Sequence, residues 1–295
     1  SGTYAFDHAD LGVFHGIAGI ISAKGEFQGT LGSIETQGTA DTPNFEVTHT
    51  KHAVPIKTKF NALVDGTTGN VTLRAVEATI VRTPAHLEGT ISSKPGEHGK
   101  TTAVNITVRE GHIDDVLRIF VREDKPPMEG ITNFKAHAVL PPGHRPFEKR
   151  IMLEGNFVIE RARWEKPSRQ ANVDMLSKRA SGKKKEPETE KVTADINGSV
   201  VLKEGVAKFS SVSFKIPGAE ANMHGEYNLE SKKIDFHGDL KTAAPLSEDT
   251  TGAKAVLLKP LNPLFRRKHA GAQVPVEMTG TYSDPHFGVV IPAKK

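Results

Sequence analysis

Hydrophobic and polar residues alternate with a period of two along most of this chain of 295 residues. From 219 to 229 every second residue is small or apolar, and the residues between them are polar. The alternation resumes from 234 to 241, after the turn residues Ser231, Lys232 and Lys233. Because successive side chains of a β-strand point to opposite faces of the sheet, the two segments predict a hairpin with one apolar and one solvated face.

The same pattern recurs elsewhere in the chain. Further segments of this kind run at 54–64, 71–75, 85–91, 102–108, 134–140, 151–159, 196–202, 206–216 and 274–282. Apolar residues take helical spacing from 112 to 121, with Asp114 and Asp115 near the expected start, and a second short helix is expected from about 172 to 179. We therefore predict a mostly β fold, built on an antiparallel sheet with one or two short helices.

The domain organisation follows from one charged stretch. Residues 181–191 are polar and charged and contain a proline, which is typical of a mobile loop. We expect a β segment at 1–168 with a short helix near 112–121, a short helix and mobile linker at 169–191, and a C-terminal β module at 192–295. The chain starts at Ser1 without a signal peptide, so we expect a fragment whose targeting or anchoring segment lies upstream.

Composition excludes several classes of function. The chain has no cysteine, which excludes a disulfide framework, a thiolate zinc site and a cysteine nucleophile. Its net charge is +4, but Lys and Arg are interspersed with Asp and Glu rather than gathered as in a nucleic-acid binder. No stretch reaches the ~18 apolar residues that a membrane-spanning helix needs.

No group of residues predicts catalysis. The loop at 96–101 resembles a phosphate-binding loop, but Lys94 stands where that motif needs a glycine, so a hairpin turn is the better interpretation. Asp114 and Asp115 are explained by the helix dipole, and Asp284 precedes a proline in a turn. We therefore predict no catalytic residue, no cofactor and no enzymatic activity.

The thirteen histidines do not predict a metal site either. His49 and His52 are three residues apart in a strand-like segment, where they would point to opposite faces. His224 and His237 fall on the polar sides of their predicted strands. Exposed strand histidines are the default interpretation, and we predict no metal site.

The segment from 256 to 268 is apolar, is broken by Pro260 and Pro263, and ends in three basic residues. An apolar wedge next to a basic cluster suits an anionic membrane surface. A buried connection across the end of the sheet is the alternative, and we favour it modestly. The candidate membrane-surface contacts are Leu257, Leu258, Leu264, Phe265, Arg266, Arg267 and Lys268.

A series of turn-and-strand motifs occurs in a fixed order. It comprises Phe209 to Phe214, Pro217-Gly218-Ala219, Gly225 to Leu229, Phe236-His237-Gly238, Leu257 to Phe265, Val274-Pro275-Val276 and Gly280 to Gly288, with Phe14 to Gly19, Val64 to Gly69 and Asp174 to Arg179 upstream. The ordered series resembles the C-terminal region of bacterial AsmA-like proteins, relatives of TamB and YhdP. The resemblance covers most of the chain and makes 192–295 an AsmA-like module.

The resemblance implies a periplasmic protein, anchored to the inner membrane by an N-terminal helix that is absent here. It implies a long sheet folded lengthwise into a groove, a role in phospholipid transport towards the outer membrane and in envelope assembly, and envelope membrane proteins as further partners. No catalytic residues come with it. We therefore expect an elongated antiparallel sheet curled into an apolar groove.

The residues supply a mechanism for that role. Two ~16-carbon acyl chains exposed to water cost about 25 kcal/mol, at ~0.8 kcal/mol per methylene, and an apolar trough removes most of that cost. A structural or assembly factor with a closed, dry β-sandwich core is the alternative, because alternation looks the same in both. The predicted lipid contacts are Phe134, Phe157, Phe214, Met223, Tyr227, Ile234, Phe236 and Leu240.

Overall fold

The computed structural model describes residues 1–13, 16–48, 50–93, 96, 98–121, 125–181, 191–243, 273–282 and 284–289. His49, most of the expected linker at 181–191 and all the candidate membrane-surface residues between 257 and 268 lie outside this range. No helix in the described ranges is long and apolar enough to cross a membrane.

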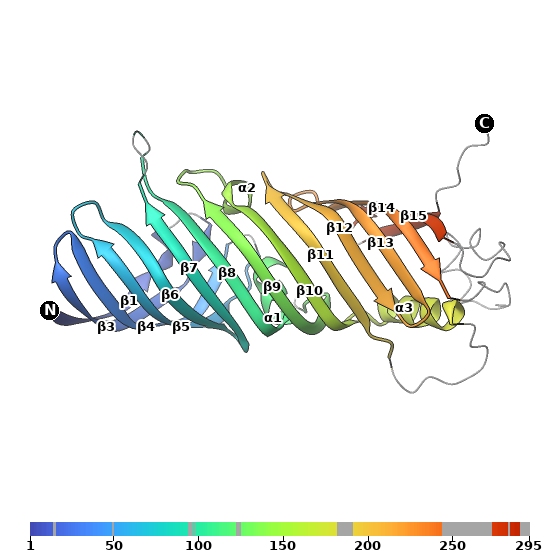
Figure 1. The fold of residues 1–295 in the computed structure, drawn as a ribbon, viewed down its shortest axis with the longest axis horizontal. Helices are drawn as coiled ribbons and strands as arrows, with labels where there is room; N and C mark the ends of the chain where they lie inside the picture. The colour runs from blue at the N-terminus through green and yellow to red at the C-terminus, as the bar shows by residue number, and fades with distance from the viewer. Residues whose placement is uncertain are drawn as a thin grey trace. The chain divides into compact units, whose positions relative to one another are not determined.

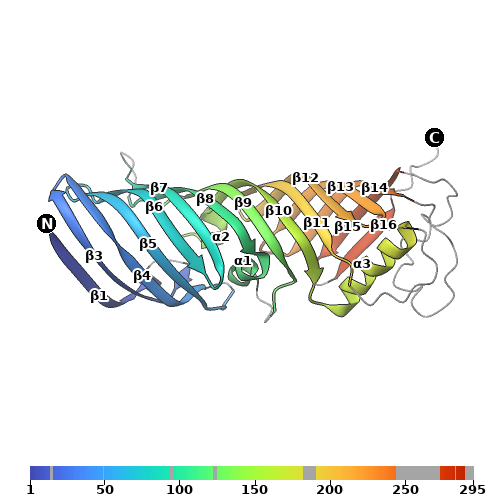
Figure 2. The ribbon, with the colours of Figure 1, turned by 60° about the horizontal axis from the view of Figure 1, so that its bottom comes forward.

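The described residues form one antiparallel sheet of sixteen strands, which confirms the mostly β prediction (Figures 1 and 2). The strands follow one another in sequence order from β1 to β16, except that β2 pairs beside β4. Their bounds are β1 Gly2–Asp10, β2 Ile17–Ala18, β3 Ile20–Thr30, β4 Ser33–Val47, β5 Val54–Asp65, β6 Asn70–Ile80, β7 Thr83–Ser92, β8 Thr101–His112, β9 Met128–Leu140, β10 Met152–Trp164, β11 Ala194–Lys203, β12 Val206–Ile216, β13 Ala219–Asn228, β14 Lys233–Thr242, β15 Gln273–Thr281 and β16 Pro285–Val289. The order runs from β1 to β16 without returning to its start, so the strands do not close into a ring.

Three α-helices interrupt the strands in the described part of the chain, where the expectation was one or two. Helix α1 (Ile113–Phe120) confirms the helix expected at 112–121, and α3 (Pro167–Ala180) begins about five residues before its predicted start. The single turn α2 (Phe147–Arg150) was not predicted, because four residues are too few to set up an apolar periodicity. A 3-10 turn, η1, spans Leu11–Val13.

The chain divides into two compact units. Unit 1 comprises residues 1–127, 131–157 and 201–205, and unit 2 comprises 128–130, 158–200 and 206–295. The predicted domain boundaries and the predicted curl of the sheet into a groove remain predictions.

In unit 1 the apolar side chains of neighbouring strands fall into rows, because directly paired residues of an antiparallel sheet share a face. One row across β4 to β9 holds Ala40, Thr58, Ala78, Ala85, Val108 and Phe134. The next row holds Gly38, Phe60, Val76, Leu87, Ile106 and Ala136. The alternation in the sequence therefore becomes a continuous apolar face within unit 1.

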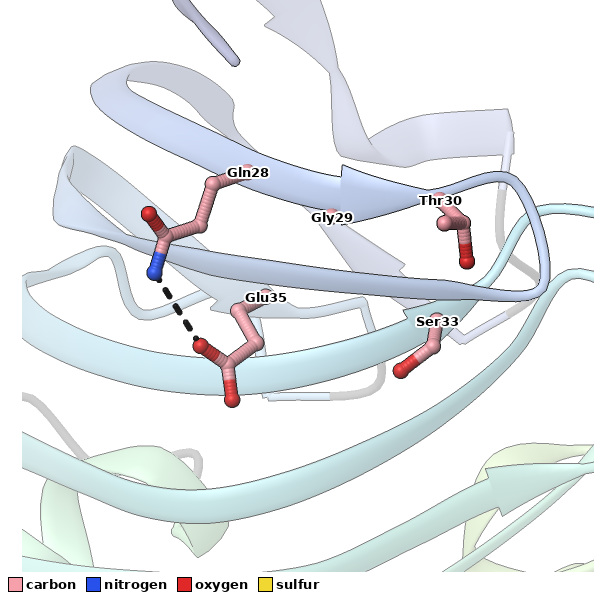
Figure 3. Close-up of a pocket in the computed structure, with 5 residues that line it drawn as sticks. All are labelled: Gln28, Gly29, Thr30, Ser33 and Glu35. Carbon is pink, nitrogen blue, oxygen red and sulfur yellow. Dashed lines mark hydrogen bonds between the residues drawn. The ribbon is translucent and has the colours of Figure 1, made fainter.

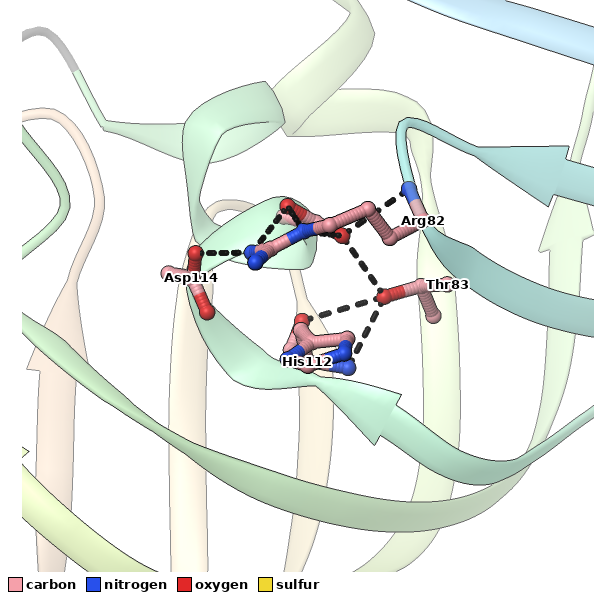
Figure 4. Close-up of polar contacts among 5 residues, drawn as sticks. Arg82, Thr83, His112 and Asp114 are labelled. Carbon is pink, nitrogen blue, oxygen red and sulfur yellow. Dashed lines mark hydrogen bonds and ion pairs between the residues drawn. The ribbon is translucent and has the colours of Figure 1, made fainter.

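A buried carboxylate attaches helix α1 to the start of β7 (Figure 4). The Asp115 side chain is fully buried and accepts hydrogen bonds from Arg82 Nη2 at 2.9 Å, from the Arg82 backbone N–H at 3.1 Å and from Thr83 Oγ1 at 3.1 Å. Arg82 Nη2 also donates to Asp114 at 2.5 Å. The hydrogen bond to Asp115 is the main reason that the pKa of Arg82 is raised. This network holds α1 in place, so that Ile119 packs in a buried cluster with Val47 and Val54.

We expect Asp115→Ala to lower the free energy of unfolding by about 3 kcal/mol, since it removes several hydrogen bonds from a buried charged acceptor. The loss stays near that value because the Arg82 side chain is 53% exposed and can rehydrate. Asp114→Ala is the control and is expected to cost about 1 kcal/mol or less. Urea denaturation followed by circular dichroism measures both, and equal losses in the two variants would contradict this role for Asp115.

Candidate apolar binding face

Strands β12 to β15 of unit 2 place their apolar residues in matching rows. The first row holds Phe209, Gly225, Phe236 and Met278, the second Val212, Met223, Gly238 and Val276, and the third Phe214, Ala221, Leu240 and Val274. A register shift between Phe209 and Val212 keeps β12 in phase, because one extra residue there returns the apolar side chains to the same face. The face of unit 2 is therefore apolar across four strands.

Aromatic contacts connect this face laterally. The ring centroids of Phe209 and Phe236 lie 5.3 Å apart, and those of Trp164 and Phe214 lie 5.8 Å apart in an edge-to-face arrangement. Both distances fall in the range of favourable aromatic pairs. Trp164 ends β10, so the apolar face of unit 2 extends beyond the four strands that carry its rows.

The structure brings six of the eight predicted lipid-contact residues onto this face. They are Phe214, Met223, Tyr227, Ile234, Phe236 and Leu240. The other two, Phe134 and Phe157, belong to unit 1, where Phe134 packs against the buried cluster of Ala78, Ala85 and Val108. The predicted lipid-contact residues therefore fall into two groups, six residues in unit 2 and two in unit 1.

The large side chains of the apolar faces are neither buried nor fully exposed. Among the described residues no Phe, Tyr, Trp or Met side chain is buried, and most are half-buried, including Met223, Phe236 and Phe209. Twelve of the buried apolar residues in the described ranges are alanines: Ala23, Ala62, Ala78, Ala85, Ala136, Ala138, Ala162, Ala180, Ala194, Ala207, Ala219 and Ala221. The others are Val, Ile and Leu, including Ile216, Leu240, Val274 and Val276 on the face of unit 2. The aromatic and Met side chains thus keep part of their surface uncovered, whereas smaller apolar side chains are buried.

Burial along the face of unit 2 changes from one end to the other. The residues nearest the turn between β12 and β13 are closely covered, with exposed fractions of 4% at Ile216, 6% at Ala219 and 5% at Leu240. We call this the Ala219 end of the face. At the other end, where Tyr227 pairs with Ile234, both side chains are half-buried, and we call this the Tyr227 end.

Glycines occupy the middle of the strands where neighbouring backbones approach most closely. A Cβ added at Gly238 would overlap with the carbonyl oxygen of Asn222 and lie 2.7 Å from the Cα of Met223. One added at Gly225 would overlap with the carbonyl oxygen of Asp235 and lie 2.6 Å from the Cα of Phe236. Glycine within a strand marks a tight bend or a close approach of another backbone, and both positions here require it.

The opposite face of unit 2 is polar and exposed, as the alternation predicts. His224 pairs directly with His237, which in turn pairs with Glu277 on β15 and contacts Asp235 Oδ1 at 2.8 Å through Nε2. Both histidines are exposed, which confirms their predicted placement. No group of three or more metal-ligating side chains gathers among the described residues, here or elsewhere.

Charged residues on the polar surface of unit 1 are held by local hydrogen bonds. Bonds from Thr67 and Thr68 in the turn after β5 lower the pKa of Asp65 to about 2. Glu35 accepts from Arg74 Nη1 at 2.9 Å and from Gln28 Nε2 at 3.2 Å, and the Arg74 bond is the main cause of its lowered pKa. These bonds are explained by turn and cross-strand pairing, without a substrate or an ion.

Two open depressions lie in the described surface of unit 1. One of about 470 Å³ lies at the tip of the hairpin β3–β4 and is lined by Gln28, Gly29, Thr30, Ser33 and Glu35 (Figure 3). Another of about 390 Å³ is lined by Glu77, Pro84, Ala85, His86, Thr107 and Arg109. Both are open, and in the second His86 Nδ1 lies 2.6 Å from Glu77 Oε1 in a cross-strand contact. The apolar faces extend over more strands than either depression, and we take them as the candidate site.

Of the residues considered for acid–base chemistry, Asp115 has structural partners for its carboxylate and Asp284 lies in a turn. Asp115 pairs with Arg82, which the sequence did not reveal because the two are 33 residues apart. Asp284 lies in the turn between β15 and β16, where its backbone N–H donates to Thr281 O at 3.1 Å. The turn placement of Asp284 was predicted, and the ion pair of Asp115 was missed.

Three contributors to the face of unit 2 were also missed: Phe209, Trp164 and Met278. Phe209 and Met278 carry the same alternation signal as their neighbours and were recoverable from it. Trp164 was not recoverable, because its contact with Phe214 joins strands far apart in the sequence.

In three comparisons with known proteins, no family model, no curated protein and no solved structure matches this chain.

Proposed function

We propose that this chain binds the acyl chains of lipids along its apolar faces and carries or shields them from water, without catalysing a reaction. The observation that carries the proposal is that the large apolar side chains are only partly buried, whereas the alanines beside them are buried. In a finished protein core, close packing would bury Phe and Met side chains almost completely. Side chains left partly uncovered over several strands provide a surface for an apolar ligand.

The energetics favour a ligand that needs little specific recognition. Each methylene moved from water onto this face gains up to ~0.8 kcal/mol, so a long acyl chain binds through its length rather than through a single polar contact. The solvated opposite face, with His224, His237 and Glu277, keeps the protein soluble around such a ligand. A continuous apolar face of this kind needs no compact pocket to hold such a ligand.

The groove is the finer part of this proposal. In the groove that we propose, the strands bend so that the apolar face lines a trough. Gly225 and Gly238 support such a bend, because only glycine allows the close backbone approach at these two positions. The resemblance to AsmA-like proteins supports a periplasmic location, an anchoring helix upstream, and transport of phospholipid towards the outer membrane during envelope assembly. Phospholipid and envelope membrane proteins are the partners we propose.

A closed structural core is the second candidate function. The buried cluster of Val47, Val54 and Ile119 beneath α1, and the covered Ala219 end in unit 2, favour it locally. In that case the apolar faces are completed by protein, and the chain serves as an assembly factor without lipid.

Native mass spectrometry of the purified chain, with extraction and analysis of co-purifying lipid, separates the two candidates. We expect adducts with the masses of phospholipids, released by organic solvent and identified in the extract. A chain that shows no adduct under gentle ionisation, and no lipid in the extract after incubation with phospholipid vesicles, would contradict the proposed function.

A further inference from the structure

Helix α3 makes contacts at both ends of the strands of unit 2. Near its C-terminus, the hydroxyls of Ser177 and Ser181 donate to the carbonyl oxygen of Pro217 at 2.8 and 3.2 Å, in the turn between β12 and β13. Near its N-terminus, Arg169 Nη2 donates to the carbonyl oxygen of Tyr282 at 2.7 Å, in the turn between β15 and β16. The Arg169 guanidinium also lies 4.8 Å from the centroid of the Tyr282 ring.

These two turns lie at opposite ends of the strands. The first adjoins the Ala219 end of the apolar face, and the second adjoins the Tyr227 end, where Ile234 pairs with Gly280. Helix α3 therefore has contacts that adjoin both ends of these strands. It contacts β13, and the closely covered part of the face is the Ala219 end, next to its serine contacts.

The side of α3 that faces protein carries polar as well as apolar residues. Its buried side chains include Gln170, Ser177 and Ala180, and Gln170 bonds to chain segments flanking the helix: it accepts from the backbone N–H of Trp164 at 2.9 Å and donates to the carbonyl of Val192 at 2.8 Å. The buried Oδ1 of Asn172 has no hydrogen-bond partner among the described residues. Detachment from the strands exposes the small side chain of Ala180 but lets this oxygen reach water.

We propose that α3 is a releasable strap across the apolar face of unit 2, and that its detachment opens the Ala219 end to an entering acyl chain. This inference rests on the proposed lipid-binding function, for which it supplies the step that controls entry. The strap uses contacts to backbone carbonyls at hairpin turns, so it can leave and return without repacking the strands. Its serine contacts at Pro217 adjoin Ile216 and Ala219, which are closely covered in this structure.

A reversible crosslink tests the strap. The chain contains no cysteine, so Ser181→Cys with Pro217→Cys introduces the only two thiols, at positions already joined by a hydrogen bond. A short bismaleimide with a cleavable disulfide then ties α3 to the turn. Uptake is measured with a phospholipid that carries a fluorescent acyl chain, presented in phosphatidylcholine vesicles. We expect the initial uptake rate to fall at least tenfold in the crosslinked protein and to recover when reductant cleaves the link.

The matched control is His224→Cys with His237→Cys, treated with the same reagent. These two positions lie directly opposite each other on the polar face and do not involve α3. Their crosslink is expected to leave the uptake rate within about twofold of the untreated protein. If wild-type protein takes up the lipid and the α3 crosslink leaves the rate unchanged, the strap is wrong and the lipid-binding proposal stands.

Hydrogen exchange tests the strap even if no lipid binds. Absence of uptake by wild-type protein contradicts the proposed function, whereas the strap itself predicts that amides in α3 exchange at least tenfold faster than those in the middle of β13. The double substitution Arg169→Ala and Ser177→Ala, which removes one contact at each end, should accelerate α3 exchange further and leave β13 unchanged. Exchange in α3 as slow as in β13, in both proteins, would overturn the strap.

Discussion

Gly238→Ala, although it adds only a methyl group, is expected to lower the free energy of unfolding by about 3 kcal/mol, the upper end of the range for overpacking. The new Cβ would overlap with the carbonyl oxygen of Asn222 and lie 2.7 Å from the Cα of Met223. Both of these atoms belong to the backbone of β13, so no side-chain rotation relieves the overlap. Relief requires β13 and β14 to separate, which breaks hydrogen bonds of the pair.

Gly32→Ala is the matched control for this substitution. Gly32 lies in the turn between β3 and β4, and a Cβ placed there meets no atom within 4 Å. We expect its effect to stay within about 0.5 kcal/mol. Urea denaturation followed by intrinsic fluorescence and circular dichroism measures both variants. Equal stability of the two would mean that the backbones of β13 and β14 do not approach as closely as described.

Met223→Glu and Phe236→Glu are expected to abolish lipid binding while the protein remains folded. Both side chains are half-buried on the apolar face of unit 2, so a glutamate there can turn its carboxylate towards water at a modest cost of about 1 kcal/mol. An acyl chain on the same face would instead lie against a charge, which is strongly unfavourable. In a dry core the same substitutions would cost several kcal/mol and unfold a typical domain.

The control is His224→Glu, on the polar face next to Met223 and directly opposite His237. It introduces the same charge one residue away and should change neither lipid binding nor stability appreciably. Thermal unfolding and co-purifying lipid are measured for all three variants. Loss of folding in Met223→Glu and Phe236→Glu, together with normal folding in the control, would favour the closed core over the lipid face.

Much of the fold was predictable from the alternation of the sequence. Where apolar residues dominate one side of a segment, as at 54–64 and 219–229, the predicted and observed strands agree closely. Strands β1 and β3 were missed. In β3 the reason is that the apolar side carries Gly25 and Gly29, which weaken its contrast with the polar side. Glycine has no side chain, so the sequence shows a gap where the structure has a close backbone contact.

The way in which α1 and α3 pack against the strands was not predictable from the sequence. Helix α3 is oriented by Arg169 and Tyr282, which are 113 residues apart, and α1 by Arg82 and Asp115, which are 33 apart. Neither pair belongs to a local pattern, so only the folded chain reveals it. The candidate face was predictable as a set of alternating residues, whereas its half-exposed state depends on what covers it in three dimensions.

The central claim is tested most directly by photo-crosslinking in cells. A photoreactive amino acid is placed at Phe236, on the apolar face, or at its neighbour His237, on the polar face. After irradiation, the purified chain is analysed for covalently attached lipid. We expect phospholipid at position 236 and none at 237. Absence of lipid at 236, or equal capture at both positions, would contradict an apolar face that binds acyl chains.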